Sequence, residues 1–337
     1  SGKEKLSKVK CLVLRKVTEA VTQESWFPFG RSAYYAEMYA KHALPAGRRM
    51  GQILVHRLQV RNDPMMTKLS RLQKGALDKR LLHQLGMDIT SVFHQTTDDS
   101  HKPALLHLSL DASGSMSNGD KWQKVLTVAT ALAYVGTKMR NIDTVITIRG
   151  GSEIPIVAVI FDSRTQSFPQ YAQIIKKISP NAATPEGLCF SATMDLILEN
   201  TKTHQVYFIN FSDGEPSFET PYETSGIHGV TRKRVKRAER YKNWDERYLS
   251  YSGHTAYTHT RSAVQEMRNN GVRILSYFIY AQSEYGSRPD PNREQHMRSS
   301  SVWAAFRRMY GEDAVLTSVE HAGNVLRTLN KSLLIRD

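Results

Sequence analysis

Cysteine is scarce in this sequence. Only Cys11 and Cys189 occur among its 337 residues. A disulfide framework or a cysteine-based zinc site needs more cysteines, so both are excluded. A single bridge is conceivable, but two reduced thiols in a cytoplasmic protein is the simpler interpretation. The first residues, Ser1 to Lys5, contain no apolar signal core, so we expect a cytoplasmic location.

Long apolar runs are also missing. No segment approaches the ~20 consecutive apolar residues that span a bilayer, which excludes an integral membrane protein. The phosphate-binding pattern GxxxxGK[ST] is absent as well, so we do not expect the chain to be a P-loop ATPase. An apolar content of 40% with 23% charged residues is typical of a soluble globular protein.

Acidic residues are outnumbered by basic ones. The sequence has 46 Lys and Arg against 32 Asp and Glu, a formal net charge of +14. Such an excess favours acidic partners, which are nucleic acid, anionic lipid or an acidic protein surface. We expect an acidic protein surface, with nucleic acid as the less favoured partner and no membrane.

Residues 1–100 are basic and are predicted to form a mostly helical N-terminal region. Met50, Ile53, Leu54 and Leu58 mark one face at helical spacing. The predicted helical segments are Lys5–Thr22, Ser32–Leu44, Gly47–Val60 and Met65–Leu85. The polar segment Thr96–Pro103 ends in proline and is predicted to be a linker.

Residues 104–337 follow a different pattern, in which short apolar runs alternate with helical segments. Strands are predicted over Ala104–Leu110, Asp143–Ile148, Ile154–Phe161, Gln205–Phe211, Val272–Tyr280 and Ala314–Thr317. Helices are predicted over Trp122–Met139, Tyr171–Ile178, Glu186–Leu198, Thr258–Asn269 and Asn324–Leu334. Because several strands are apolar throughout, we predict an α/β domain with a doubly wound, mainly parallel sheet and helices on both faces.

Three loops of this domain carry oxygen ligands. The first predicted strand ends in Asp111, followed by Ser113 and Ser115 in a DxSxS pattern. Thr184 precedes a predicted helix, and Asp213 follows the strand Gln205–Phe211. Each loop alone is an ordinary turn or helix start. Together they place two carboxylates and three hydroxyls where parallel sheets bind ligands, and hard divalent cations prefer such oxygen ligands.

The ordered combination DxSxS…T…SDG resembles the metal-ion-dependent adhesion site (MIDAS) of von Willebrand factor A (VWA) domains. The resemblance covers about residues 104–337. It implies a VWA or Rossmann-like fold and one divalent cation, commonly Mg²⁺, with Mn²⁺ as the alternative. It also implies that an acidic group of a partner completes the metal's coordination. The implied metal ligands are Asp111, Ser113, Ser115, Thr184 and Asp213.

A narrower resemblance links the chain to the CobT-type subunit of aerobic cobaltochelatase, of which phages carry relatives. It rests on Arg48-Arg49, Ile53 to Arg61, Leu72 to Asp78, Val92-Phe93, Leu108 to Met116, Phe211 to Pro216, Tyr241 and Tyr257. The acidic central region of that subunit is absent, so the chain resembles a shorter relative or a fragment of it. The resemblance implies cobalamin biosynthesis and an AAA+ ATPase partner of the chelatase or MoxR-like type.

An insertion of unusual length lies between Asp213 and the helix predicted at Thr258, over about residues 214–257. Connections in compact domains commonly have ~4–6 residues. Tyr241, Trp244, Tyr248 and Tyr251 are interleaved with basic residues, which can bind single-stranded nucleic acid. We favour a solvated helix packed by its aromatics, or a protein-docking role. The candidate partner or nucleic-acid contacts are Arg232, Lys233, Arg234, Lys236, Arg237 and Arg240.

The sequence therefore predicts a metal-dependent adaptor or regulatory subunit of a CobT-like complex that works with an AAA+ ATPase. We expect it to be non-catalytic and assign no catalytic residue. The first alternative is a nucleic-acid-binding VWA protein of the Ro type, although about 100 N-terminal residues are too few for a long helical-repeat ring. The second is a metal-dependent hydrolase, for which Glu215 is the nearest candidate base and no supporting motif is found.

Overall fold

The computed structural model describes residues 9–30, 32–61, 66–72, 74, 76–77, 81, 91–98, 102–221, 248–281, 290 and 292–318. Contacts divide the chain into two units. The larger unit falls within Ser1–Val55 and Pro103–Asp337, and the smaller one within His56–Lys102. The oxygen ligands predicted from the sequence all belong to the larger unit.

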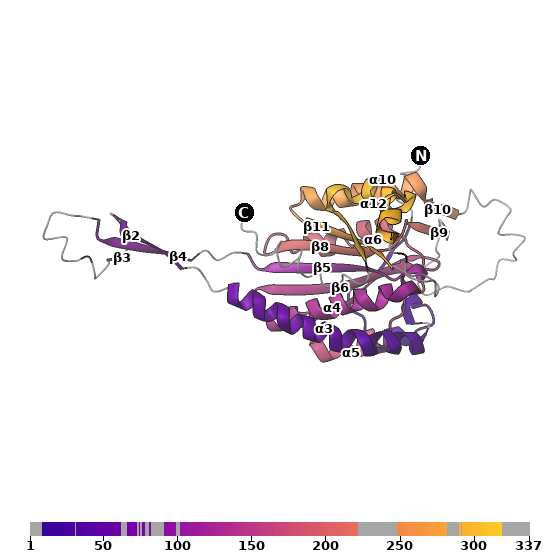
Figure 1. Cartoon of the computed structure of the whole chain (residues 1–337), viewed down its shortest axis with the longest axis horizontal. Helices are drawn as coiled ribbons and strands as arrows, with labels where there is room; N and C mark the ends of the chain where they lie inside the picture. Colours follow the sequence, from indigo (N-terminus) through magenta and orange to yellow (C-terminus); the bar gives the residue numbers. More distant parts are fainter. Residues whose placement is uncertain are drawn as a thin grey trace, which may run out of the picture. The chain divides into compact units, whose positions relative to one another are not determined.

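A seven-stranded sheet forms the centre of the larger unit (Figure 1). Its strand order is β1 (Leu12–Leu14), β7 (Pro155–Asp162), β6 (Ile142–Gly151), β5 (Ala104–Asp111), β8 (Gln205–Ser212), β11 (Arg273–Tyr280) and β12 (Ala314–Ser318). All neighbouring strands are parallel except β6 and β7, which are antiparallel. β5, β7 and β8 are buried along nearly their whole length, as expected of strands covered on both faces.

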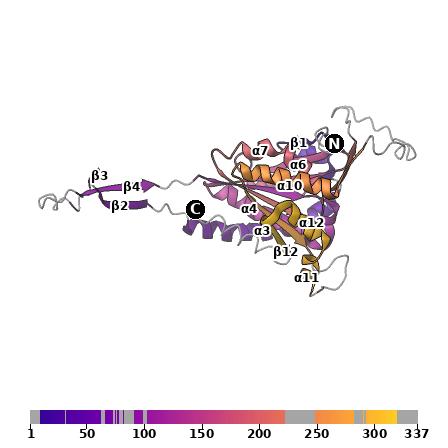
Figure 2. The ribbon, with the colours of Figure 1, turned by 90° about the horizontal axis from the view of Figure 1, so that it is seen from above.

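Helices cover both faces of this sheet, which confirms the predicted α/β architecture (Figures 1 and 2). One face carries α3 (Ala33–Arg61), α4 (Lys121–Lys138) and α5 (Phe168–Ile175). The other carries α6 (Glu186–Ala192), α7 (Met194–Leu198), α10 (Gly253–Asn269) and α12 (Ser301–Tyr310). Shorter helices are α2 (Glu19–Gln23), η1 (Pro28–Gly30), η3 (Gly114–Asp120), α11 (Arg293–Arg298) and η4 (Gly311–Asp313).

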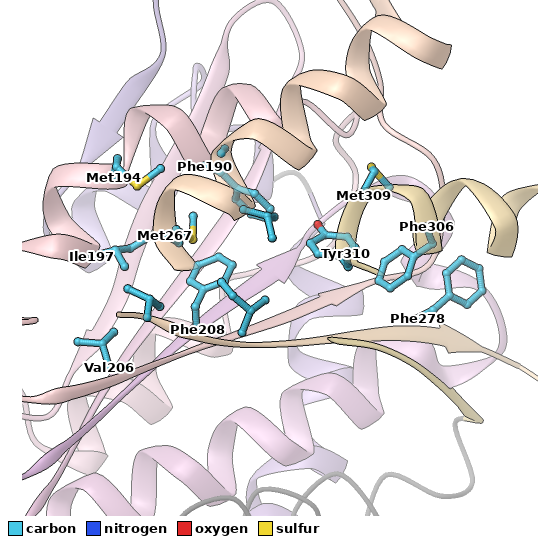
Figure 3. Close-up of a cluster of buried hydrophobic side chains, with 14 of the residues drawn as sticks. Phe190, Met194, Ile197, Val206, Phe208, Met267, Phe278, Phe306, Met309 and Tyr310 are labelled. Atoms are coloured by element: carbon cyan, nitrogen blue, oxygen red, sulfur yellow. The ribbon is translucent and has the colours of Figure 1, made fainter. Parts of the chain in front are cut away.

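An apolar core lies between the sheet and the layer of α6, α7, α10 and α12 (Figure 3). Phe190 and Phe208 meet edge to face with ring centroids 5.1 Å apart, and Phe278 meets Phe306 in the same way at 5.3 Å. Trp303 and Phe306 of α12 are both buried in this core. This packing fixes the helices that follow the site loops.

The smaller unit contains an antiparallel sheet of β2 (Met66–Leu72), β4 (Phe93–Asp98) and β3 (Ala76–Leu77), in that order. The helix predicted over Met65–Leu85 is therefore wrong at β2 and β3. The predicted linker from Thr96 to Pro103 is wrong at its start, because Thr96 to Asp98 belong to β4. Pairing between β4 and its neighbours gives these residues their strand conformation. Such pairing leaves no periodic pattern in the local sequence.

The N-terminal region is helical at α2 and α3, but the helix predicted over Lys5–Thr22 is wrong at Leu12–Leu14. That segment is β1, which pairs with β7 and extends the main sheet. A short apolar run has no distinguishing periodicity, so pairing at the open edge of the sheet decided its conformation. The predicted helices Ser32–Leu44 and Gly47–Val60 are one helix, α3, which continues through Pro45. The predicted domain limits, 1–100 and 104–337, stay predictions.

The ends of the long insertion pair with each other as β9 (Ser217–Pro221) and β10 (Tyr248–Ser252), which are antiparallel. α10 begins at Gly253 and not at the predicted Thr258, because β10 delivers the chain directly into the helix. Tyr251 is buried beside Phe218 and Leu188, so this aromatic packs on the domain. The helix predicted over Asn324–Leu334 lies outside the described residues.

The two cysteines, Cys11 and Cys189, are both free thiols. Among the helices in the described part of the chain, none is long and apolar enough to cross a membrane.

Gly187 of α6 is packed so closely that Gly187→Ala should lower the free energy of unfolding by about 1–3 kcal/mol. A Cβ there would lie 2.4 Å from the Tyr251 hydroxyl oxygen and 2.8 Å from Thr260 Cα. The α10 backbone can yield only by separating from α6. Urea denaturation followed by circular dichroism measures the effect. Gly214→Ala is the matched control, because its Cβ would meet nothing within 4 Å. Equal losses in both variants would contradict this close packing.

Candidate metal centre

The predicted ligands lie at the carboxyl ends of β5 and β8, two adjacent strands in the middle of the sheet. Asp111 is the last residue of β5, and Asp213 directly follows β8. From β5 the chain crosses through α4 to β6 on one side, and from β8 it reaches β11 through α10 on the other. The direction of winding changes between β5 and β8. Such a switch point opens a crevice in which doubly wound sheets bind ligands.

Backbone hydrogen bonds tie the three predicted loops together. The amides of Asn181 and Ala182 donate to the Ala112 carbonyl oxygen, each at 3.0 Å, and Gly114 N donates to Ala182 O at 2.9 Å. Thr184 N donates to Ser217 O at 3.0 Å, and Ser217 N donates back to Thr184 O at 3.1 Å. These bonds hold the Thr184 loop between the loops that follow β5 and β8.

Four of the five predicted ligands are joined by hydrogen bonds. Ser115 Oγ donates to Asp213 Oδ1 at 2.7 Å, and the Ser113 and Ser115 hydroxyl oxygens are 3.0 Å apart. Ser113 N donates to Asp111 Oδ1 at 2.9 Å. Asp111 and Ser113 are buried, whereas Ser115 is exposed. We call these four residues with Thr184 the oxygen cluster.

Thr184 reaches this edge through its backbone position. Its side chain is buried, and its main chain pairs with Ser217 just beyond the Asp213 loop. The structure thus brings all five predicted residues to one edge of the sheet. Their role as metal ligands stays a prediction.

The cluster has the chemistry of a site for a hard divalent cation. It offers two carboxylates and three hydroxyls at one edge, which suits Mg²⁺ or Mn²⁺. In the described residues, no group of three or more His, Cys, Asp or Glu side chains is placed to hold a metal. A cation at this edge must therefore rely on the hydroxyls. A Cβ added to Gly114 or Gly214 would meet nothing within 4 Å, so both loops border open space.

Lys121 is a neighbour of the cluster that the sequence did not reveal. It is the first residue of α4, and its Nζ lies 2.5 Å from Asp213 Oδ2. Its side chain is only 6% exposed and that of Asp213 only 1%. A lysine at the start of a helix is usually solvated, so its position in the sequence gave no signal of this contact.

A second buried ion pair lies beneath the cluster. The Arg149 guanidinium of β6 lies 2.6 Å from Glu186 Oε1 at the start of α6, and 3.9 Å from Asp111 Oδ2. It also donates to the carbonyl and the hydroxyl of Ser109, both at 3.0 Å. An arginine directly after the β-branched run Val145–Ile148 was the one sequence signal that could have indicated this pair.

Burial raises the pKa of the Asp111 carboxyl to about 6, even though the nearby Arg149 charge acts to lower it. Ser212 Oγ also donates to Asp111 Oδ2 at 2.7 Å and favours the ionised form. Asp111 is therefore a buried carboxylate held by two donors and a neighbouring cation. This arrangement fixes the direction in which its oxygens face.

Other predicted contacts are not part of this cluster. Glu215, the weak candidate base, accepts a hydrogen bond from the Tyr257 hydroxyl at 2.5 Å. The basic residues Arg232, Lys233, Arg234, Lys236, Arg237 and Arg240, and with them Tyr241 and Trp244, lie outside the described residues. Their predicted role in partner or nucleic-acid contact stays a prediction.

No family model and no curated protein matches the chain. Among solved structures, the pilus adhesin SpaC from Lactobacillus rhamnosus GG matches with a TM-score of 0.46 and 13% identity, over 70% of this chain and 30% of that one. The vWF domain of the type V pili tip protein Mfa5 from Porphyromonas gingivalis matches with a TM-score of 0.41 and 12% identity, over 70% and 97%. The mussel byssus protein PTMP1, with a zinc-occupied MIDAS motif, matches with a TM-score of 0.41 and 11% identity, over 69% and 48%.

The matched structures thus include a vWF domain and a protein with a MIDAS motif. The match spans less than half of the SpaC and PTMP1 chains. With TM-scores below 0.5, these likenesses carry no argument about function. A proposed function can therefore rest only on the site geometry and the sequence motif.

Proposed function

We propose that this chain is a VWA-type adaptor that holds one divalent cation, Mg²⁺ or Mn²⁺, in the oxygen cluster and uses it to dock a partner protein. The observation that carries the proposal is the hydrogen-bonded chain of Asp111, Ser113, Ser115 and Asp213 at the carboxyl ends of β5 and β8. The metal, when bound, supplies a positive charge and an open coordination position for an acidic group.

The partner in this proposal presents a carboxylate. The cluster has two carboxylates and otherwise neutral hydroxyls, so a dication there keeps room for a further anionic ligand. Ser115 is exposed, and the loops around Gly114 and Gly214 border open space, which gives a partner access. The resemblance to the CobT-type subunit makes an AAA+ ATPase of the chelatase or MoxR-like type the proposed partner. The chain then acts as its non-catalytic regulatory subunit.

Asp111→Asn should weaken metal binding strongly while the fold survives. Asparagine keeps an oxygen for the Ser113 amide but removes one of the two carboxylate charges, so we expect Mg²⁺ affinity to fall by about 100-fold or more. Isothermal titration calorimetry with Mg²⁺ measures the affinity, and circular dichroism checks the fold. Asp195→Asn, an exposed carboxylate on α7, is the control and should bind like the wild type. Unchanged affinity in folded Asp111→Asn contradicts the assigned site.

The same variants test docking. A purified ATPase of the proposed type from the same genome should bind the wild type in Mg²⁺, and should bind neither the wild type in EDTA nor Asp111→Asn in Mg²⁺. If the ATPase still binds the wild type in EDTA and still binds Asp111→Asn in Mg²⁺, the docking surface does not include the metal site. Filter binding of single-stranded RNA across a salt series examines the nucleic-acid alternative, in which binding should weaken steeply with salt.

A further inference from the structure

Lys121 places a cation of the chain itself on a predicted metal ligand. Its ammonium lies 2.5 Å from Asp213 Oδ2, and the other oxygen of that carboxylate accepts from Ser115 Oγ at 2.7 Å. Both oxygens of Asp213 therefore have partners within the chain. Because both side chains are almost fully buried, this is a desolvated ion pair and not a surface contact.

The backbone before Lys121 holds it in this position. Gly119 and Asp120 both have positive φ, at 58° and 60°, and Asp120 is the only residue other than glycine with positive φ in the described part of the chain. This double turn ends η3 and starts α4 at Lys121. Glycine adopts left-handed backbone without strain, and aspartate tolerates it better than most residues with a side chain, so both residues suit this turn. The turn thereby sets where the Lys121 backbone enters α4, while its side chain stays free to rotate.

We infer that Lys121 is a tethered counter-ion that occupies Asp213 in the metal-free protein and competes with the divalent cation for that carboxylate. The inference rests on the proposed function, because it concerns the same cluster. A dication bound to Asp213 Oδ2 and an ammonium at the same oxygen repel each other at a separation of a few ångströms. The lysine must move away when the metal binds, and its flexible four-carbon stem permits this.

The competition has two consequences. The metal-free site does not leave two buried carboxylates facing each other, since the ammonium neutralises one of them. The apparent affinity for metal is lowered by the fraction of molecules in which the lysine has left Asp213. Lys121 therefore sets the metal concentration at which the site fills, and with it the concentration at which a metal-dependent partner docks.

Lys121→Met removes the ammonium and keeps most of the apolar stem. We expect this variant to bind Mg²⁺ at least about tenfold more tightly than the wild type, which corresponds to a lysine that leaves Asp213 in about one molecule in ten. In EDTA its unfolding temperature should be lower than that of the wild type, because Asp213 is buried without its partner. Saturating Mg²⁺ should close that gap. Calorimetry and thermal unfolding followed by circular dichroism measure both effects.

Lys124→Met is the matched control. Lys124 is half-buried three residues further along α4, so its removal takes the same charge from the same helix. We expect its Mg²⁺ affinity to stay within about twofold of the wild type, because a partly solvated charge is screened. This comparison separates competition at Asp213 from a general change in charge.

A second measurement uses the unmodified chain, so it stands even if Lys121→Met fails to fold. Lysine acylation by an amine-reactive acetyl ester, read by mass spectrometry, should increase several-fold at Lys121 when Mg²⁺ replaces EDTA, and should stay constant at Lys124. Equal acylation of Lys121 in both conditions, or a folded Lys121→Met that binds no more tightly than the wild type, overturns the inference while the proposed metal site stands. Absence of Mg²⁺ binding in both wild type and folded Lys121→Met overturns both.

Discussion

Replacing Arg149 by methionine is expected to lower the free energy of unfolding by about 3–5 kcal/mol, because it breaks a buried ion pair by removing one partner. Arg149 and Glu186 are both fully buried, and their charged atoms lie 2.6 Å apart. Without the guanidinium, the buried Glu186 carboxylate loses the cation that pairs with it, and Asp111 loses the cation 3.9 Å away. Methionine fills a similar volume, so the loss arises mainly from charge.

Urea denaturation at neutral pH, in EDTA and followed by circular dichroism, measures this effect. Arg164→Met is the matched control, because Arg164 pairs with Asp162 at 2.8 Å with both side chains partly exposed. Such pairs contribute about 0–1 kcal/mol. The double variant Arg149→Met/Glu186→Gln should recover part of the loss, since it removes the stranded charge. A loss in Arg149→Met no larger than that in Arg164→Met would refute the role of the buried pair.

His107→Leu should remove much of the loss of stability that the wild type shows between pH 6.5 and pH 4. Burial lowers the pKa of His107 from 6.5 to about 4, an effect that Asp162 opposes and Arg164 reinforces. The folded state therefore holds this imidazole neutral where the unfolded chain protonates it. Its contribution is fully present above pH 6.5 and is lost as the pH falls towards 4, which amounts to roughly 3 kcal/mol.

At neutral pH, His107→Leu should lower the free energy of unfolding only slightly. The ring Nε2 lies 3.3 Å from Thr147 Oγ1, and that hydroxyl donates to Leu108 O at 2.9 Å, so the ring's hydrogen bonding contributes little. We expect a loss of about 1 kcal/mol at pH 7.5. Urea denaturation at half-unit pH steps measures the pH dependence. His42→Leu, on the exposed surface of α3, is the control and should keep the wild-type pH dependence. If the free energy of unfolding of His107→Leu falls with pH as steeply as that of the wild type, burial of this imidazole does not cause the loss of stability in acid.

The alternation of apolar strands and periodic helices predicted the α/β class correctly. Strands that are buried on both faces of a parallel sheet are apolar along their whole length, and this is visible in the sequence. The same pattern predicted α4 to within one residue at each end. It also placed Asp111, with Ser113 and Ser115 after it, and Asp213 at the carboxyl ends of strands, and Thr184 in the loop before a helix. The reason is that strand order and loop position follow from local sequence once the winding is known.

The local sequence patterns did not predict which distant segments pair as strands. β1 and β2 read as helix, because a strand of three to seven residues gains its stability from the strand beside it and not from its own propensity. β9 and β10 pair across the insertion in the same way. Each of these elements depends on contacts that are far apart along the chain.

The sequence by itself determined the fold class and the identity of the oxygen cluster, because hydrophobic periodicity and the DxSxS…T…SDG motif are local properties. Only the tertiary structure decided which charges surround that cluster. Lys121 meets Asp213 across 92 residues, and Arg149 meets Glu186 across 37. Such ion pairs are selected by desolvation, because a buried charge is tolerated only where folding brings an opposite charge to it. The sequence names these residues, but burial is what pairs them.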